Sequence, residues 1–161
     1  MSPEEEKGVR NEEKFFAAAR LHTKHTPLWF LWVYRASIKQ DILGVDARVI
    51  ISMKNGKRNI VPIQIKSSFA GAKKYQLEMP VLQAENVCTV VINQYMSDED
   101  VRQRLYAVLE QIREENRRFD MFWEEILSHY VAGKTMFTHK KRRQRQRRMR
   151  ESQEDKRVGH P

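Results

Sequence analysis

The sequence lacks the features that mark secreted or membrane proteins. It has one cysteine, Cys88, so no disulfide can form within the chain. Its longest apolar run, around residues 28–34, is far shorter than the roughly 20 residues that a membrane-spanning helix needs. The N-terminal MSPEEEKG is acidic, unlike a secretory or transit signal. We therefore expect an intracellular protein without a membrane span, either cytoplasmic or nucleoid-associated.

Acidic and apolar residues are scarce at the C-terminal end. The chain carries 30 Lys/Arg and 21 Asp/Glu, a net charge of +9. Residues 140–161 hold ten of those basic residues and only three of the acidic ones. Such a segment cannot bury a core, so we expect residues 135–161 to form a disordered tail that binds DNA or RNA electrostatically. The tail residues predicted to bind nucleic acid are Lys140, Lys141, Arg142, Arg143, Arg145, Arg147, Arg148 and Arg150.

The remaining chain, residues 1–134, has the length and apolar content of one domain with a modest core. Ser2 and Pro3, followed by three glutamates, predict the start of a helix over about residues 4–23. After Pro27, the aromatic run LWFLWVYR predicts a buried strand. Residues 41–68 form two extended runs joined by MKNGKRN, which predicts a hairpin.

The second half of this domain mixes one more strand with helices. Residues 69–86 have no clean period and predict either a short helix or a loop. NVCTVVINQ predicts a strand covered on both faces, with Cys88 as a small core residue. Ser97 predicts the start of a long helix, and a further helix is expected over residues 120–132. This order of elements predicts an α/β sandwich around a mixed central sheet.

Four polar residues suit the chemistry of phosphodiester hydrolysis. That reaction needs a hard cation on oxygen ligands and a positive group near the attacking water. Asp46 lies in the first run of the hairpin, and Gln64 and Lys66 point to the same face of the second. Glu12 lies at the edge of the apolar face of the first helix. Oxygen ligands would come from Asp46, Gln64 and Glu12, and the ammonium from Lys66.

At these residues the sequence resembles the PD-(D/E)XK nuclease superfamily. KGVRNEEKFF is similar to the glutamate-bearing helix of archaeal Holliday-junction resolvases. GVD stands where the family has PD, and Gln-Ile-Lys stands where it has (D/E)XK. The QXK form, followed by hydroxyl residues, is similar to a variant found in some intron-encoded endonucleases and small nuclease-like families. The resemblance covers about residues 7–92.

The resemblance implies a restriction-endonuclease-like α-β-β-β-α-β fold with C-terminal helices added. It also implies Mg²⁺ or Mn²⁺ bound by Asp46, Gln64 and Glu12, with Lys66 as a further catalytic residue. Two positions depart from the family pattern. Val45 replaces the proline of PD, which is not a ligand. Gln64 replaces an acid, which removes one negative charge from the metal site.

Each candidate also has an ordinary structural interpretation. Asp46 would then be a solvated edge-strand or turn aspartate, and Lys66 an exposed strand lysine. Gln64 would bond a neighbouring strand or loop, and Glu12 would be a solvated helix acid, with Glu13 competing for its role as a ligand.

Three further positions have both a functional and a structural interpretation. Asp41 could act as a second acid, but the sequence favours a cap at the entry to a strand. Ser67 and Ser68 could contact phosphate or end their strand.

Three functions are compatible with these residues. The first is a Mg²⁺-dependent endonuclease that hydrolyses DNA. The second is a Holliday-junction resolvase, which needs a symmetric homodimer to cut two strands. The third is a catalytically inactive DNA- or RNA-binding module, favoured by the neutral Gln64 and the arginine-rich tail.

Overall fold

The computed structural model describes residues 1–42, 44–79, 86–119 and 150–151. The chain forms two compact units, one of residues 1–36 and 45–121 and the other of residues 37–44 and 122–161. The predicted helix over residues 120–132, the boundary at residue 134 and nearly all of the basic tail lie outside the described residues. Within the described ranges, no helix has both the length and the apolar character needed to cross a membrane.

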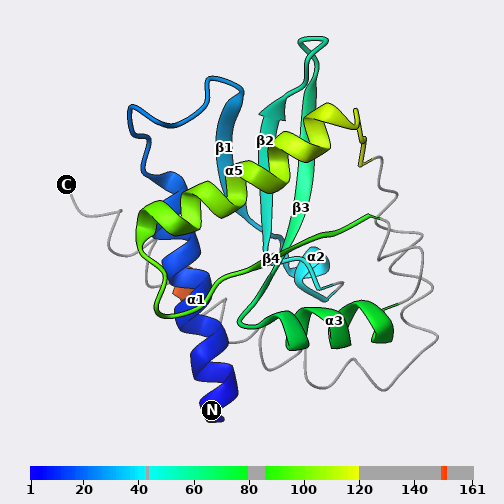
Figure 1. The fold of residues 1–161 in the computed structure, drawn as a ribbon. Coiled ribbons are helices and arrows are strands. Elements are labelled where there is room, and N and C mark those ends of the chain that lie inside the picture. Colours follow the sequence, from blue (N-terminus) through cyan, green and yellow to red (C-terminus); the bar gives the residue numbers. More distant parts are fainter. Residues whose placement is uncertain (43, 80–85, 120–149, 152–161) are drawn as a thin grey trace. The chain divides into compact units, whose positions relative to one another are not determined.

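A mixed four-stranded sheet forms the centre of the first unit (Figure 1). Strands β1 (Phe30–Arg35), β2 (Ala47–Ser52) and β3 (Arg58–Lys66) are antiparallel neighbours, and β4 (Cys88–Val91) pairs parallel to β3. The predicted hairpin is confirmed, because β2 and β3 are joined by a turn in which Gly56 adopts φ +82°. The α/β class and the mixed central sheet are therefore confirmed.

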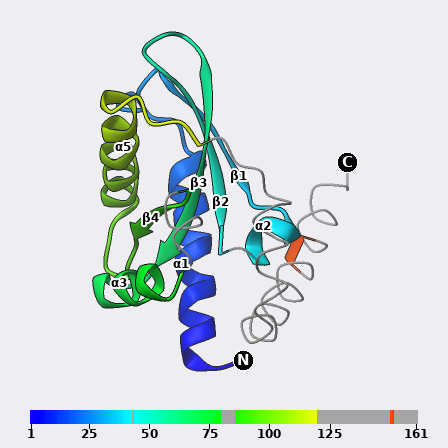
Figure 2. The same cartoon turned by 90° about the vertical axis from the view of Figure 1, so that its right-hand side faces the viewer.

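One face of this sheet packs into the core. Ala47, Val49 and Ile51 of β2 alternate with more exposed residues, and they pair with the buried residues of β3. Helices α1 (Pro3–Arg20) and α5 (Asp98–Glu114) add Phe15, Phe16, Leu105 and Leu109 to the same core cluster. Figure 2 shows α5 on one side of the strands. Arg102 of α5 contacts α1 by donating a hydrogen bond to the Ala18 carbonyl at 3.3 Å.

Both long helices begin where the sequence predicts. The Ser2 and Ser97 hydroxyls accept the N–H groups of Glu5 and Asp100, and both carboxylates accept the N–H of their cap in return. α1 ends at Arg20, somewhat before the predicted end. Helix α3 (Phe69–Glu78) confirms the helical alternative for the start of residues 69–86, whereas residues 80–85 lie outside the described chain.

The prediction of a buried strand at LWFLWVYR is wrong in one respect. The strand is present, but it lies at the edge of the sheet and only two of its six residues are buried. Phe30 and Val33 are buried in the core, whereas Trp32 is 39% exposed and Tyr34 is 45% exposed. A continuous apolar run predicts a strand that is buried on both faces. The sequence does not reveal whether another element of the fold covers the face that points away from the core.

The interpretation of Asp41 as a strand cap is also wrong. Asp41 lies in α2 (Ile38–Ile42), a short helix of the second unit, and the extended run begins only after Gly44. Ser37 and Gln40 explain this start, because the Gln40 N–H donates to the Ser37 hydroxyl and the Ser37 N–H donates to the Gln40 side chain. These reciprocal bonds favour a helical turn over a strand.

Candidate active site

Asp46 lies beside the strand that carries Gln64 and Lys66. The register pairs Ala47 with Ile63, and Asp46, one residue earlier, leaves this register because its N–H donates to the carbonyl of the same Ile63. Ala47 and Ile63 point into the core, and successive side chains of a strand alternate between faces. Gln64 and Lys66, two residues apart on β3, therefore share the opposite face, and Asp46 contacts the same strand through the Ile65 N–H. The structure places three of the four predicted residues together at this end of the hairpin.

The Asp46 carboxylate is fully buried and helps to hold the two strands together. Its Oδ2 accepts the Ile65 N–H at 2.8 Å, and the Asp46 N–H donates to the Ile63 carbonyl at 2.8 Å. The carboxylate thus takes a position that a strand carbonyl would otherwise occupy. With a relative exposure of 0%, Asp46 is not the solvated edge aspartate of the ordinary interpretation.

Gln64 is buried, and one of its two side-chain polar atoms has no hydrogen-bond partner within the described chain. Its Nε2 donates to the Ile65 carbonyl at 3.4 Å, a long hydrogen bond. Its Oε1 is buried and has no hydrogen-bond partner within the described chain. A buried acceptor without a partner costs about 1–3 kcal/mol, and an amide oxygen is a ligand type that hard cations use. This orphaned oxygen is the feature that best fits the implied cation.

Lys66 is held by a residue that the sequence reasoning missed. Its Nζ lies 4.3 Å from the ring centroid of Tyr75 in α3, a cation–π contact. Tyr75 is 8% exposed and shares the buried side of α3 with Ala72, three residues earlier. That spacing was the available signal, but it becomes readable only once residues 69–78 are known to be helical.

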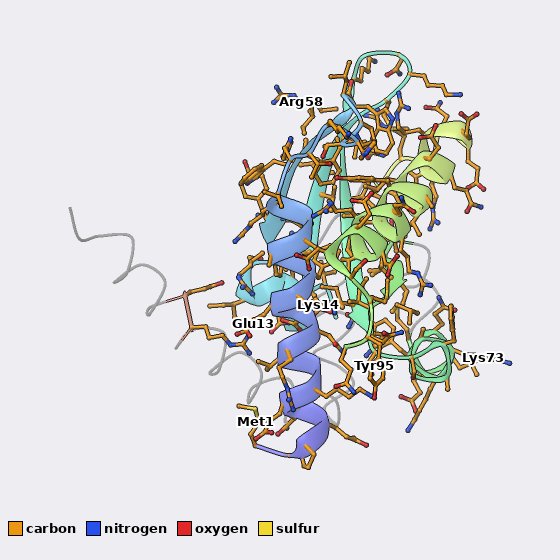
Figure 3. All side chains as sticks on the ribbon, turned by 60° about the vertical axis from the view of Figure 1, so that its left-hand side comes forward. Met1, Glu13, Lys14, Arg58, Lys73 and Tyr95 are labelled. Atoms are coloured by element: carbon orange, nitrogen blue, oxygen red, sulfur yellow. The ribbon has the colours of Figure 1, made fainter. Side chains whose placement is uncertain are left out.

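Glu12 is buried, and its competitor Glu13 is exposed. Glu12 is 3% exposed and belongs to the side of α1 that carries Phe16 one turn later. Figure 3 shows Glu13 on α1 beside Lys14. The Arg35 guanidinium lies 4.3 Å from the Phe16 ring centroid, so a cation is close to this side of the helix.

The helix side that holds Glu12 packs on the core face of the sheet, whereas Gln64 and Lys66 alternate with core residues and lie on the other face. Glu12 as a metal ligand therefore stays a prediction. Over the residues that the structure describes, no three His, Cys, Asp or Glu side chains form a group suited to a metal ion. The donors that the geometry does bring together are one carboxylate and one amide oxygen.

The hydroxyl and basic residues predicted to bind nucleic acid are only partly described. Ser68 caps α3, and its hydroxyl accepts the Gly71 N–H at 3.0 Å, which bears out the strand-ending alternative. Ser67 is half-buried, and its contact with phosphate stays a prediction. Arg150 is helical and half-buried, while residues 140–148 lie outside the described chain.

Cys88 takes no part in the chemistry of this site. It lies on β4 and packs against the core, as predicted. Burial raises the pKa of its thiol to about 11, although the positive charge of Arg117 acts in the opposite direction. A thiol with this pKa is protonated at neutral pH and is therefore a poor nucleophile.

Comparison of the sequence with protein-family models finds no matching family. Comparisons with curated proteins and with solved structures find no match either. The functional assignment therefore depends on the residues of the chain itself.

Proposed function

We propose that this chain is a metal-dependent endonuclease that hydrolyses DNA phosphodiester bonds. The observation that carries the proposal is the set of three side chains at one end of the hairpin. A buried carboxylate of Asp46, a buried and unpartnered amide oxygen of Gln64 and the ammonium of Lys66 lie together there. The order of the described elements, with α2 set aside, also agrees with the α-β-β-β-α-β core of the PD-(D/E)XK superfamily.

Each residue has a role in this proposal. Asp46 and Gln64 would hold Mg²⁺ or Mn²⁺, with Glu12 as a third ligand. Such a cation neutralises phosphate charge and lowers the pKa of water. Lys66, held over the ring of Tyr75, would orient the attacking water or stabilise the charge that develops on the phosphate. The net charge of +9 favours a polyanionic substrate such as DNA.

The test is cleavage of plasmid, single-stranded and four-way-junction DNA in the presence of Mg²⁺ or Mn²⁺. The informative variants are Asp46→Asn and Lys66→Met, with Lys57→Met in the exposed hairpin turn as the matched control. Asparagine removes the charge at residue 46 but keeps an acceptor for the Ile65 N–H. We expect both site variants to lose most of the activity and the control to keep it. Equal cleavage by all four proteins would reject the proposal.

Burial of the site favours one second candidate, a nucleic-acid-binding module without catalysis. Asp46 and Gln64 are only 0% and 1% exposed, so a phosphate reaches them only after the groups around them move. Titration calorimetry with Mn²⁺ distinguishes the two functions. Absence of a binding heat, together with nucleic-acid binding that is lost on removal of residues 140–161, would favour the module. A Mn²⁺ heat abolished by Asp46→Asn would favour the enzyme.

A further inference from the structure

The sheet face that carries Gln64 and Lys66 becomes exposed and largely apolar further along the hairpin. The register pairs Trp32 with Ile50 and Ile50 with Ile60, so these side chains form one row across β1, β2 and β3. Trp32 is 39% exposed and Ile60 is 50% exposed. On the other face, the neighbouring residues of β2 and β3 are buried in the core. This face is therefore the accessible one.

A second row links the first to the candidate active site. Tyr34 pairs with Arg48, and Arg48 pairs with Pro62. Tyr34 is 45% exposed. Residues two apart on a strand are separated by roughly 7 Å, so Pro62 lies about that far from Gln64 along β3. The exposed side chains Trp32 and Tyr34 are therefore followed on this face by half-buried Arg48 and then by the buried residues Pro62 and Gln64.

Two arginines on this face, Arg48 and Arg58, are candidates for binding an anion. Within the described chain, neither Arg48 nor Arg58 makes a side-chain hydrogen bond or an ion pair, and the Arg48 Nε is buried without an acceptor. Arg58 pairs with Ser52 and lies beside the hairpin turn (Figure 3). Arg58 is exposed and Arg48 is half-buried, so a phosphate can pair with guanidinium nitrogens other than the buried Arg48 Nε.

We call six residues of this face the strand platform: Trp32, Tyr34, Arg48, Ile50, Arg58 and Ile60. The His22 ring stacks on Trp32 with a centroid distance of 5.9 Å and an interplanar angle of 29°. That contact fixes the orientation of the indole before any ligand arrives. A fixed aromatic ring loses little conformational entropy on binding, which favours the stacking of a planar group.

We propose that the strand platform binds single-stranded DNA. Unpaired bases would stack on Trp32 and Tyr34, and phosphates would pair with Arg48 and Arg58. Duplex DNA keeps its bases stacked within the helix and cannot offer them to the rings. Delivery of the strand to Asp46 and Gln64 rests on the proposed nuclease function, whereas binding by the platform does not.

A second copy of the chain is a less suitable occupant of the same face. A two-fold interface brings the same surface of both subunits together. Arg48 and Arg58 would then face the same two arginines, and the described part of the platform holds no carboxylate to offset their charge. Like charges across an interface oppose association. Single-stranded DNA offers planar bases that suit the rings of Trp32 and Tyr34 and the negative charge that this surface lacks.

The test measures the affinity of the full chain for a fluorescein-labelled oligothymidylate by anisotropy, with EDTA present so that no cleavage occurs. We expect Trp32→Ala and Tyr34→Ala each to weaken binding by about tenfold. Tyr95→Ala is the matched control, because Tyr95 is 87% exposed but lies in the turn after β4, far from Arg58 in Figure 3. Its affinity should stay within about twofold of wild type, a change too small for the loss of a base stack.

Three further comparisons separate stacking from unfolding and from charge. Trp32→Phe keeps an aromatic ring and should retain most of the affinity that Trp32→Ala loses. An abasic oligonucleotide has the same phosphates without bases, so Trp32→Ala should leave its binding unchanged. Arg48→Gln and Arg58→Gln should each reduce the slope of log affinity against log salt by roughly 0.7.

The platform is rejected if Trp32→Ala and Tyr34→Ala bind oligothymidylate as wild type does. It is also rejected if folded Trp32→Phe loses as much affinity for oligothymidylate as Trp32→Ala does. The same holds if Trp32→Ala weakens binding of the abasic oligonucleotide to the same extent, or if Trp32→Ala dissociates a dimer in analytical sedimentation. Normal oligothymidylate binding by the platform variants, with cleavage abolished by Asp46→Asn, would reject the platform alone. If the wild-type protein cleaves no DNA but the platform variants bind oligothymidylate more weakly than it does, only the nuclease function is rejected.

Discussion

Replacing Asp46 by alanine should destabilise the fold more than replacing it by asparagine. The Asp46 carboxylate accepts the Ile65 N–H at 2.8 Å, and both residues are buried. Alanine leaves that N–H without an acceptor, which costs about 1–3 kcal/mol. The asparagine side-chain carbonyl can still accept it. We therefore expect the two variants to differ by about 1–3 kcal/mol in free energy of unfolding, although both lack the carboxylate charge.

Urea denaturation followed by circular dichroism measures this difference. The alanine variant should unfold at a lower urea concentration than the asparagine variant, with the same dependence on denaturant in both. Equal midpoints would show that the hydrogen bond at Asp46 does not stabilise the fold and would refute the reasoning.

The same titration tests whether Asp46 binds a cation. Mg²⁺ or Mn²⁺ at about one hundred times its dissociation constant should stabilise the wild-type protein by about 2.7 kcal/mol. Asp46→Asn should gain much less, because it lacks the anionic ligand. Equal stabilisation of both proteins would exclude Asp46 as a ligand.

Three further outcomes follow from the packing. Cys88 should alkylate slowly at neutral pH until urea unfolds the chain, and fast alkylation of the native protein would contradict this. The free energy of unfolding should fall by up to about 3 kcal/mol as the pH rises from about 9 to about 11, because the thiol of the unfolded chain ionises first. The same pH dependence in Cys88→Ala would contradict this second expectation. Leu105→Ala should cost about 2–5 kcal/mol in thermal or urea unfolding, whereas exposed Leu77→Ala should change stability by less than about 0.5 kcal/mol; similar values would contradict the core assignment. If Lys66 is catalytic, Tyr75→Leu should lower kcat and shift its pH profile while Tyr75→Phe restores both, and equal effects of leucine and phenylalanine would exclude the cation–π contact as the cause.

Local signals in the sequence were sufficient for several elements. Ser2 and Ser97 each place a hydroxyl three residues before an acid, so both helix starts were readable from a few neighbouring residues. The turn between β2 and β3 was readable because Gly56 follows an asparagine, which suits a left-handed turn. The polar residues 46, 64 and 66 stood out because apolar patterning does not explain them.

The sequence by itself thus determined the α/β class, the hairpin, the two capped helices and three of the candidate site residues. Tertiary structure alone decided that β1 is a half-exposed edge strand, that Tyr75 lies beside Lys66 and that Glu12 is buried on the core-facing side of α1. The physical reason is one of range. Caps and turns form between residues a few positions apart, whereas register, coverage and side-chain contacts depend on residues brought together from distant parts of the chain. The same register that pairs the Asp46 end of β2 with β3 also aligns Trp32 with Ile50 and Ile60 on the exposed face.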